Sequence, residues 1–406
     1  MNLNPIILSI PIYFILIGFE LLVQHFQQEN HYRLNDAITN ISCGITDQVV
    51  HVFMKLFTIT IYQWVFQNFA IFSIPHHWLA YILLFIACDF CYYWAHRKSH
   101  EINLFWIGHV VHHQSEEYNL SVALRQGALQ VVFTFFFFLP LAFAGFDTVS
   151  FVLMNGLVTI YQFWIHTESI GKMGWFEKIF NTPSHHRVHH GRDPKYIDKN
   201  HAGVFIIWDK MFGTFQEEEE HPTYGITTPV NTWNPLKSHI SPIRNLFISA
   251  SKVKGLDKLL VLLKPPGWMP EYAGGFQKPK PVDVKIFKKF DTGANKNLGI
   301  YILFQYVILI AGTAMFLFLH EKFNLILHFL GAIAIIHGIV NFGLLFENKR
   351  WAFYSEIVRL LLLPFVISFF TSGILYSKEL FFMTGGVSLI SIGVFWAVLR
   401  KRAVQN

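Results

Sequence analysis

Apolar stretches long enough to form membrane-spanning helices recur along this chain, and they constrain its fold more than any other feature. A helix needs about 20 mostly apolar residues to cross the hydrocarbon core of a bilayer. Of the 406 residues, 53% are hydrophobic and only 14% are charged, whereas soluble domains carry about 25% charged residues. The composition therefore predicts an all-α fold, a multipass transmembrane helical bundle.

We expect about nine membrane spans from the positions of these stretches. The fourth and fifth are joined by a very short connection, which predicts an antiparallel hairpin. The expected spans cover residues 5–23, 48–72, 78–94, 128–146, 149–165, 298–319, 325–345, 357–376 and 380–399.

The distribution of Lys and Arg predicts the orientation of the bundle, because basic residues concentrate in cytoplasmic loops. The loops on the opposite face hold only Lys322 and Lys378. This pattern predicts a cytoplasmic helical cap, with the N-terminus outside and the C-terminus inside. The net charge of +6 follows from this orientation, so we expect no nucleic-acid partner. The other face holds Arg33, Arg97, Lys98, Arg125, the basic stretch 172–296, Lys349, Arg350, Arg400, Lys401 and Arg402.

Proline and glycine mark a boundary within the chain. Residues 265–296 begin with a dense series of these residues, which is typical of a linker. We therefore predict a catalytic membrane domain over 1–264, a linker over 265–296 and a C-terminal transmembrane helical region over 297–406.

Nine histidines fall into three spaced clusters and one single position on the predicted cytoplasmic side. Spacings of three and four residues return side chains to one helical face, so each cluster is expected to direct its imidazoles at one spot. A tetrahedral site needs about four ligands, so nine candidates predict two metals. The candidates are His96, His100, His109, His112, His113, His166, His186, His189 and His190.

Two of the apolar helices carry polar residues on the same face as a histidine that follows them in the sequence. Asp89 shares one helical face with His96 and His100. An aspartate in an apolar run is costly in lipid, so we expect Asp89 to serve the site by orienting an imidazole. Asn155 and Gln162 precede His166 at helical spacing in the same way.

Ligand type leaves the metal open, because imidazole suits zinc, copper, iron and nickel. No thiolate or bridging carboxylate accompanies the clusters. A redox metal beside a lipid pocket can activate O₂ against a C–H bond, and hydrolysis by zinc is the competing chemistry. A histidine-rich metal transporter is the alternative from another class, although transporters usually place their ligands near the bilayer midplane.

The histidine boxes and the short gap between the first two resemble the fatty acid hydroxylase and sterol desaturase superfamily of membrane di-iron enzymes. Within it, several segments are most similar to the alkylglycerol monooxygenases. These are the His96-Arg-Lys-Ser-His100-Glu101 box and residues 112–126, 185–192, 208–215, 266–268 and 341–345. The similarity covers most of the chain.

The resemblance implies an iron-dependent oxidoreductase that hydroxylates the carbon next to an ether oxygen of a membrane lipid. It further implies two irons, O₂ and tetrahydrobiopterin, and a pterin or outer-shell role for Glu101. The inner membrane is expected in a bacterium and the endoplasmic reticulum in a eukaryote. A sterol or fatty acyl hydroxylase or desaturase, fed by a separate electron-transfer protein, is the alternative enzyme.

Three residues after the second box are candidates for a pterin or headgroup pocket: Tyr118, Asn119 and Arg125. The sequence departs from some relatives at Ile170, where they carry another histidine. The ligand count is therefore open by one, with His166 standing alone and Glu168 as a neighbour that can compensate.

Overall fold

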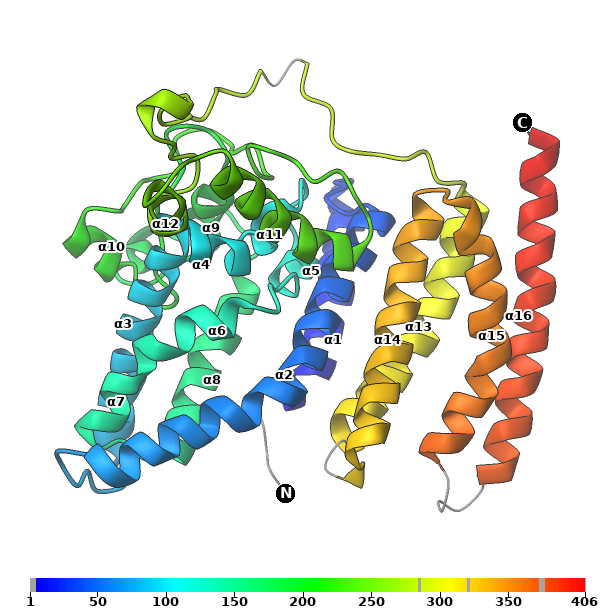
Figure 1. Ribbon diagram of the computed structural model, residues 1–406, viewed down its shortest axis with the longest axis horizontal. Helices are drawn as coiled ribbons and strands as arrows, with labels where there is room; N and C mark the ends of the chain where they lie inside the picture. The colour runs from blue at the N-terminus through cyan, green and yellow to red at the C-terminus, as the bar shows by residue number, and fades with distance from the viewer. Residues whose placement is uncertain (1–4, 284–285, 320–321, 372–376, 406) are drawn as a thin grey trace.

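The structure is a computed structural model that describes residues 5–283, 286–319, 322–371 and 377–405. Within these residues every regular element is helical, and the only β-type pairings are the isolated bridges Phe180↔Phe205 and Gly191↔Tyr224. Long helices form a bundle, and shorter elements gather over one end of it as a cap (Figure 1). The all-helical prediction is confirmed.

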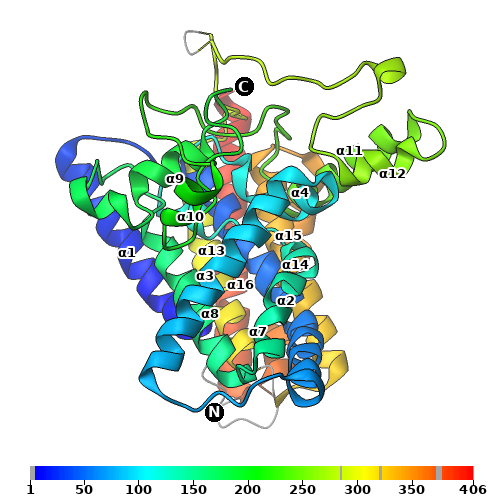
Figure 2. The same cartoon turned by 90° about the vertical axis from the view of Figure 1, so that its left-hand side faces the viewer.

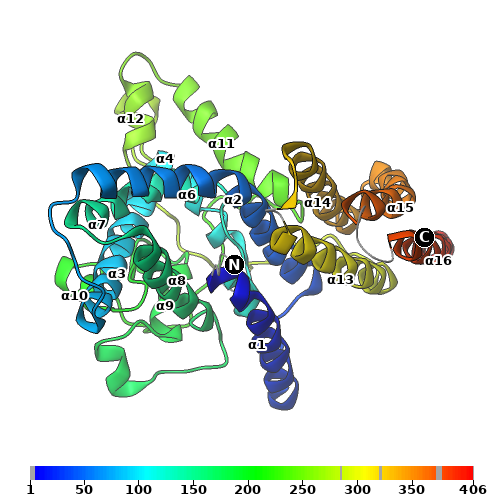
Figure 3. The same ribbon diagram turned by 90° about the horizontal axis from the view of Figure 1, so that it is seen from below.

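Long helices make up the two sides of the bundle. Figure 3 shows that α2 runs from the side of the bundle that contains α7 toward the side that contains α13 and α14. The long helices are α1 (Pro5–Gln27), α2 (Leu34–Phe69), α3 (Trp78–Glu101), α13 (Lys296–Leu319), α14 (Leu325–Phe346), α15 (Arg350–Phe370) and α16 (Ser377–Gln405), and the shorter α8 (Thr148–Trp164) packs among them.

Short helices build the cap and one arm of a hairpin. In Figure 2, α11 and α12 extend sideways from the cap. The hairpin arm consists of α6 (Gln130–Thr134), η2 (Phe135–Phe138) and α7 (Leu139–Ala144). The cap consists of α4 (Asn103–His109), η1 (His112–Gln114), α5 (Leu120–Ala123), η3 (Gly174–Lys178), α9 (Pro183–His190), α10 (Ile207–Phe212), α11 (Pro235–Ser251), α12 (Asp257–Leu263) and η4 (Glu271–Ala273).

Six helices in the described residues are long and apolar enough to cross a membrane, and a seventh crossing requires the two halves of α2 together. Leu34–Met54 and Phe57–Phe69 meet at a bend of 47°. The side chains facing outward are large and apolar, as Ile15, Leu83 and Phe382 illustrate with exposures of 70%, 61% and 74%. This surface suits lipid and not water, so the chain is an integral membrane protein.

The prediction of nine spans is not confirmed. The expected spans 128–146 and 149–165 form helices that are too short for a full crossing. The first is broken into three pieces at the four phenylalanines of η2, and the second begins only where the Asp147 carboxylate caps the Val149 and Ser150 amides at 3.0 Å. Apolar composition cannot reveal such breaks. The end of the expected span 357–376 lies outside the described residues.

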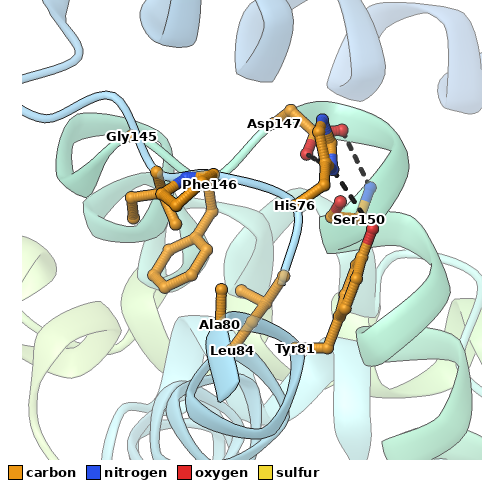
Figure 4. A pocket seen from close by; sticks show the side chains of 10 residues that line it. His76, Ala80, Tyr81, Leu84, Gly145, Phe146, Asp147 and Ser150 are labelled. Carbon is orange, nitrogen blue, oxygen red and sulfur yellow. Dashed lines mark hydrogen bonds and ion pairs between the residues drawn. The ribbon is translucent and has the colours of Figure 1, made fainter. Parts of the chain in front are cut away.

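A small pocket lies where this hairpin meets the loop before α3 (Figure 4). His76 Nδ1 lies 3.1 Å from the Tyr81 hydroxyl and 3.8 Å from an Asp147 oxygen. His96 follows His76 by 20 residues, most of them in α3. At about 1.5 Å of rise per residue this pocket is far from the clustered histidines, and it contributes nothing to them.

The cap and the C-terminal helices are joined by close backbone packing. A Cβ atom on Gly343 of α14 would lie 2.3 Å from the Trp233 carbonyl oxygen, so only glycine permits this approach. Glu347 accepts hydrogen bonds from the Trp233 amide at 2.9 Å and the Thr232 hydroxyl at 2.5 Å. The segment from residue 264 to residue 295 crosses above the bundle with η4 as its one described helix (Figure 1).

A buried ion pair organises the four C-terminal helices. Glu356 is fully buried on α15 and accepts two hydrogen bonds from Arg359, at 2.7 and 2.9 Å. Tyr301 of α13 and Asn341 of α14 also donate to Glu356, at 2.5 and 2.8 Å. Arg359 continues to Gln305, which in turn donates to a serine of α16. One carboxylate therefore connects the helices where the bilayer offers no other partner.

Arg359→Met should destabilise the protein strongly, because it leaves the Glu356 charge buried without its cation. Breaking a buried pair from one side typically costs about 3–5 kcal/mol. Thermal unfolding of the purified protein in detergent measures the effect. Arg350→Met, at an exposed position at the start of the same helix, is the control, and equal melting temperatures for the two variants would contradict the proposed role.

Candidate metal centre

The nine histidines come together as two adjacent groups under the cap. Each is exposed by 5% or less. In each group the potential ligand atoms lie within 4.8 Å of one another. The five-histidine group contains His96, His100, His109, His113 and His189, and the four-histidine group contains His112, His166, His186 and His190.

Two of the histidine boxes divide their members between the groups. In the second box His113 joins the five-histidine group and His112 the four-histidine group. In the third box, on α9, His189 and His190 separate in the same manner. Consecutive residues of a helical turn point in directions about 100° apart, so adjacent imidazoles cannot serve one centre. The expectation that each box serves one spot is therefore wrong for these two boxes, which join both centres.

Backbone carbonyls hold the outer nitrogens of four histidines. The Nδ1 atoms of His96, His112, His166 and His189 lie 2.7–2.9 Å from carbonyl oxygens. Those oxygens belong to His201, Arg125, Gln162 and Lys199. A carbonyl can only accept, so each Nδ1 carries the proton and each Nε2 presents a lone pair inward.

The inner nitrogens converge closely. His109 Nε2 lies 2.9 Å from His96 Nε2 and 3.0 Å from His113 Nε2. His166 Nε2 lies 3.2 Å from His112 Nε2 and 3.0 Å from His186 Nε2. The Nε2 atoms of three further members, His100, His189 and His190, have no hydrogen-bond partner in the part of the chain that the structure describes. Buried lone pairs that face one another need a cation, so the donor set fits bound metal.

The imidazoles outside the long helices are held in their neutral form. Burial lowers the pKa of His109 and of His166 to about 4. Burial, and then the neighbouring histidines, also lower the pKa values of the remaining cap histidines well below the usual range; these are His112, His113, His186, His189 and His190. Metals bind neutral imidazole, so the site is ready for metal at neutral pH.

Asp89 contacts the loop next to the histidine groups and not the imidazoles themselves. It accepts hydrogen bonds from the Val204 and Phe205 amides and the Trp208 indole, at 2.7–2.9 Å. A Cβ atom on Gly203 would lie 2.7 Å from an Asp89 oxygen, so the chain passes very near this carboxylate. Asp89 therefore fixes the segment that follows the His201 carbonyl and does not itself contact an imidazole nitrogen, contrary to expectation.

The expected pocket residues have separate roles. Asn119 donates to the His31 carbonyl and caps α5 by accepting from the Ser121 amide. Arg125 donates to the Val111 carbonyl at 2.7 Å, and its remaining donors meet Asn40, Gln114 and Ser238. Both side chains make hydrogen bonds inside the protein, and Arg125 also lines a pocket together with Arg33, Gln114 and Phe290.

Tyr118 and Glu101 stay closer to the centre. The Tyr118 ring lies 5.3 Å from His190 and stacks on Tyr224 at 4.9 Å, which places it beside the four-histidine group. Glu101 directly follows His100 and pairs with Arg97 at 2.6 Å and Lys98 at 2.5 Å. Its carboxylate is about one-third exposed, so it forms part of an accessible charged rim.

Glu168 does not replace a missing ligand. It accepts a short hydrogen bond from Tyr224 and pairs with His221 at 3.1 Å, and it lies outside both histidine groups. The Ile170 carbonyl accepts a hydrogen bond from Arg187 at 2.8 Å. His166, in contrast, is a full member of the four-histidine group.

Sequence reasoning missed the outer partners of the site. Asp198 Oδ1 lies 3.3 Å from His100 Nδ1, and Gln130 Oε1 lies 3.1 Å from His109 Nδ1. Asp198 lies in a loop and Gln130 at the start of α6, and neither follows the spacing of the histidine boxes, so no sequence pattern could have indicated them.

Comparison with known proteins agrees with this centre. The sequence model of the family described as Fatty acid hydroxylase matches residues 78–214, which contain all nine histidines. The alkylglycerol monooxygenase of Homo sapiens is 38% identical over 340 residues, covering 81% of this chain and 75% of the relative. That of Caenorhabditis elegans is 35% identical over 373 residues, covering 82% and 70%. The chain belongs to the alkylglycerol monooxygenase family.

Membership of this family makes the chain an oxidoreductase, a lipid monooxygenase. The ornithine lipid hydroxylase OlsE of Rhizobium tropici is a more distant relative, 26% identical over 138 residues that cover 33% of this chain and 41% of the relative. No solved structure matches the chain. The relatedness to alkylglycerol monooxygenases extends well beyond the histidine boxes, as the sequence resemblance implied.

Removing one histidine from either group should lower the metal content of the purified protein, because the group loses one of its donors. His113→Ala tests the five-histidine group and His186→Ala the four-histidine group, with elemental analysis of the purified protein as the measurement. His25→Ala, at an exposed position on α1, should change nothing. Unchanged metal content in both group variants would exclude these histidines as ligands.

Proposed function

We propose that the chain is a di-iron monooxygenase that cleaves the O-alkyl bond of alkylglycerol lipids with O₂ and a reduced pterin. The observation that carries the proposal is the pair of buried imidazole groups at the cap end of lipid-exposed helices. Similarity to alkylglycerol monooxygenases over most of the chain supports this substrate class. Iron and tetrahydrobiopterin are taken from the resemblance.

The reaction inserts one oxygen atom of O₂ into the C–H bond beside the ether oxygen. Two electrons and two protons reduce the other atom to water, and the pterin supplies the electrons. The resulting hemiacetal breaks its C–O bond to give a fatty aldehyde and a glycerol derivative. Bound iron would supply the O₂ activation, and the nine histidines would hold it.

The protein's own residues keep the donors aligned and the site dry. The carbonyls of Arg125, Gln162, Lys199 and His201 fix the imidazole planes. Tyr118 covers the four-histidine group, and its hydroxyl donates a hydrogen bond to the Ile165 carbonyl at 2.9 Å. Glu101, at the exposed rim beside His100, is the residue we propose to receive the pterin.

Two alternatives have less support. A sterol or fatty acyl hydroxylase would share the boxes, but the sterol desaturase of Aspergillus fumigatus matches only 36% of this chain, at 26% identity. A metal transporter would place its donors along the membrane crossing. The two groups here instead join the end of α3 to cap helices.

Purified protein with iron should release fatty aldehyde from a radiolabelled 1-O-alkylglycerol only when tetrahydropterin is present. His112→Ala and His189→Ala should abolish turnover because each removes an inner nitrogen, and both variants should still insert into the membrane. Chromatography of the lipid products measures the reaction. Turnover without pterin, or turnover of a sterol in place of the ether, would contradict the proposal.

We also propose that the histidine centre faces the cytoplasm, since most Lys and Arg side chains lie on the cap side. An impermeant maleimide should label Glu219→Cys, on the exposed cap surface, only from the cytoplasmic side. Ser73→Cys, in the exposed loop between α2 and α3, should react only from the other side. The native Cys43 and Cys88 are buried, and Cys91 is partly buried. The reverse labelling pattern would overturn the orientation.

A further inference from the structure

A four-residue strap, Asp198 to His201, runs across the five-histidine group. It provides three of the acceptors that hold this group. Asp198 Oδ1 lies 3.3 Å from His100 Nδ1, the Lys199 carbonyl 2.9 Å from His189 Nδ1, and the His201 carbonyl 2.7 Å from His96 Nδ1. The strap therefore belongs to this group and not to the four-histidine group.

The backbone of the strap is held firmly in place. The Asp209 carboxylate accepts hydrogen bonds from the His201 amide at 2.7 Å and the Ala202 amide at 2.8 Å. Asn200 donates its side-chain amide to the His185 and Gln216 carbonyls. Asp198 and Asn200 adopt left-handed φ angles of 57° and 53°, which these two residue types tolerate best after glycine. These contacts fix the backbone at His201 and so limit where its side chain can lie.

The His201 ring stands among the rings of the five-histidine group. Its centroid lies 5.0 Å from that of His100 and 5.6 Å from those of His96 and His189. Members of the group have similar spacings, since His100 lies 5.0 Å from His109 and 5.3 Å from His96. Its ring nitrogens are not among the five ligand atoms that lie within 4.8 Å of one another, so the His201 ring would have to turn toward a bound ion to reach it.

The ring nitrogens of His201 make no hydrogen bond of ordinary geometry in the described residues. Burial lowers the pKa of the imidazole, although the Asp198 backbone lies near enough to raise it against that effect. The side chain is 1% exposed, and neither ring nitrogen has a hydrogen-bond partner among residues 5–283, 286–319, 322–371 and 377–405. A buried polar group without a partner costs about 1–3 kcal/mol. A phenylalanine would fill the same space without this cost. An imidazole at this position therefore indicates a bond to a metal ion in the five-histidine group.

We propose that His201 is a tenth ligand, which completes a six-imidazole environment for the metal of the five-histidine group. The inference rests on the proposed function in requiring that metal occupies both groups. Six imidazoles would then surround a metal in this group, whereas four histidines would hold a metal in the other group. The four-histidine group, beside Tyr118, would therefore be the one with fewer protein donors.

His201→Phe tests the proposal because it keeps a ring in place and removes both nitrogens. Protein loaded with ⁵⁷Fe should show a Mössbauer change in one of two iron signals, and one iron should pass to a chelator at least about tenfold faster. Cobalt-substituted protein should show a stronger visible absorption, as expected when a six-coordinate ion becomes five-coordinate. None of these readouts depends on turnover.

His185→Phe is the matched control. His185 is another buried histidine of this region, and its ring packs on Phe215 at 5.5 Å outside both groups. This variant should keep both iron signals and the wild-type release rate. If His201→Phe fails to fold, His201→Asn removes the imidazole while keeping a polar amide, and it should give the same spectral change.

The outcomes separate the two hypotheses. Wild-type protein that holds fewer than two metals would refute the di-iron function. Two metals together with unchanged spectra in the His201 variants would refute the ligand role alone. Faster iron release without a change in the cobalt spectrum would also refute it, because His201 would then contact only a neighbouring ligand and not the metal.

Discussion

The convergence of buried imidazole lone pairs is the constraint on which the rest of this structure depends. Neutral Nε2 atoms facing one another at about 3 Å are unfavourable unless a cation lies between them. The protein opposes this repulsion by holding the opposite Nδ1 of six of the nine rings. Four of the holding groups are main-chain carbonyls, so the irregular path of the cap has a direct chemical reason.

Further shells of hydrogen bonds support those carbonyls. Asp209 holds the backbone around His201, and Asp89 holds the next residues from within α3. Asp89 thus connects a membrane helix to a cap loop, and Asp209 connects the same loop to the cap helix α10. Arg125 has a similar role near the second box. Its guanidinium group donates hydrogen bonds to the Val111 carbonyl and to Asn40, and its own carbonyl accepts the hydrogen bond of His112 Nδ1. Polar residues of the membrane half serve the centre through backbone placement.

The division of two boxes between the groups makes the centres interdependent. A shift of α9 moves His189 in one group and His190 in the other. The groups still differ in their surroundings, since the strap from Asp198 to His201 covers one and Tyr118 with Tyr224 covers the other.

The sequence by itself determined that the chain is an apolar helical membrane protein, that nine particular histidines converge, and which family it belongs to. Hydropathy and helical spacing are local properties, so they can be read directly from the residues. Only the tertiary structure decided which group each imidazole joins, which partners Asp89, Asn119 and Arg125 bind, and that the 128–165 hairpin is built from short helices. It also placed His201, which follows no box spacing, beside the five-histidine group. Those features depend on how α3, α4 and α9 pack against distant loops, and three-dimensional packing leaves no periodic trace in the residues that produce it.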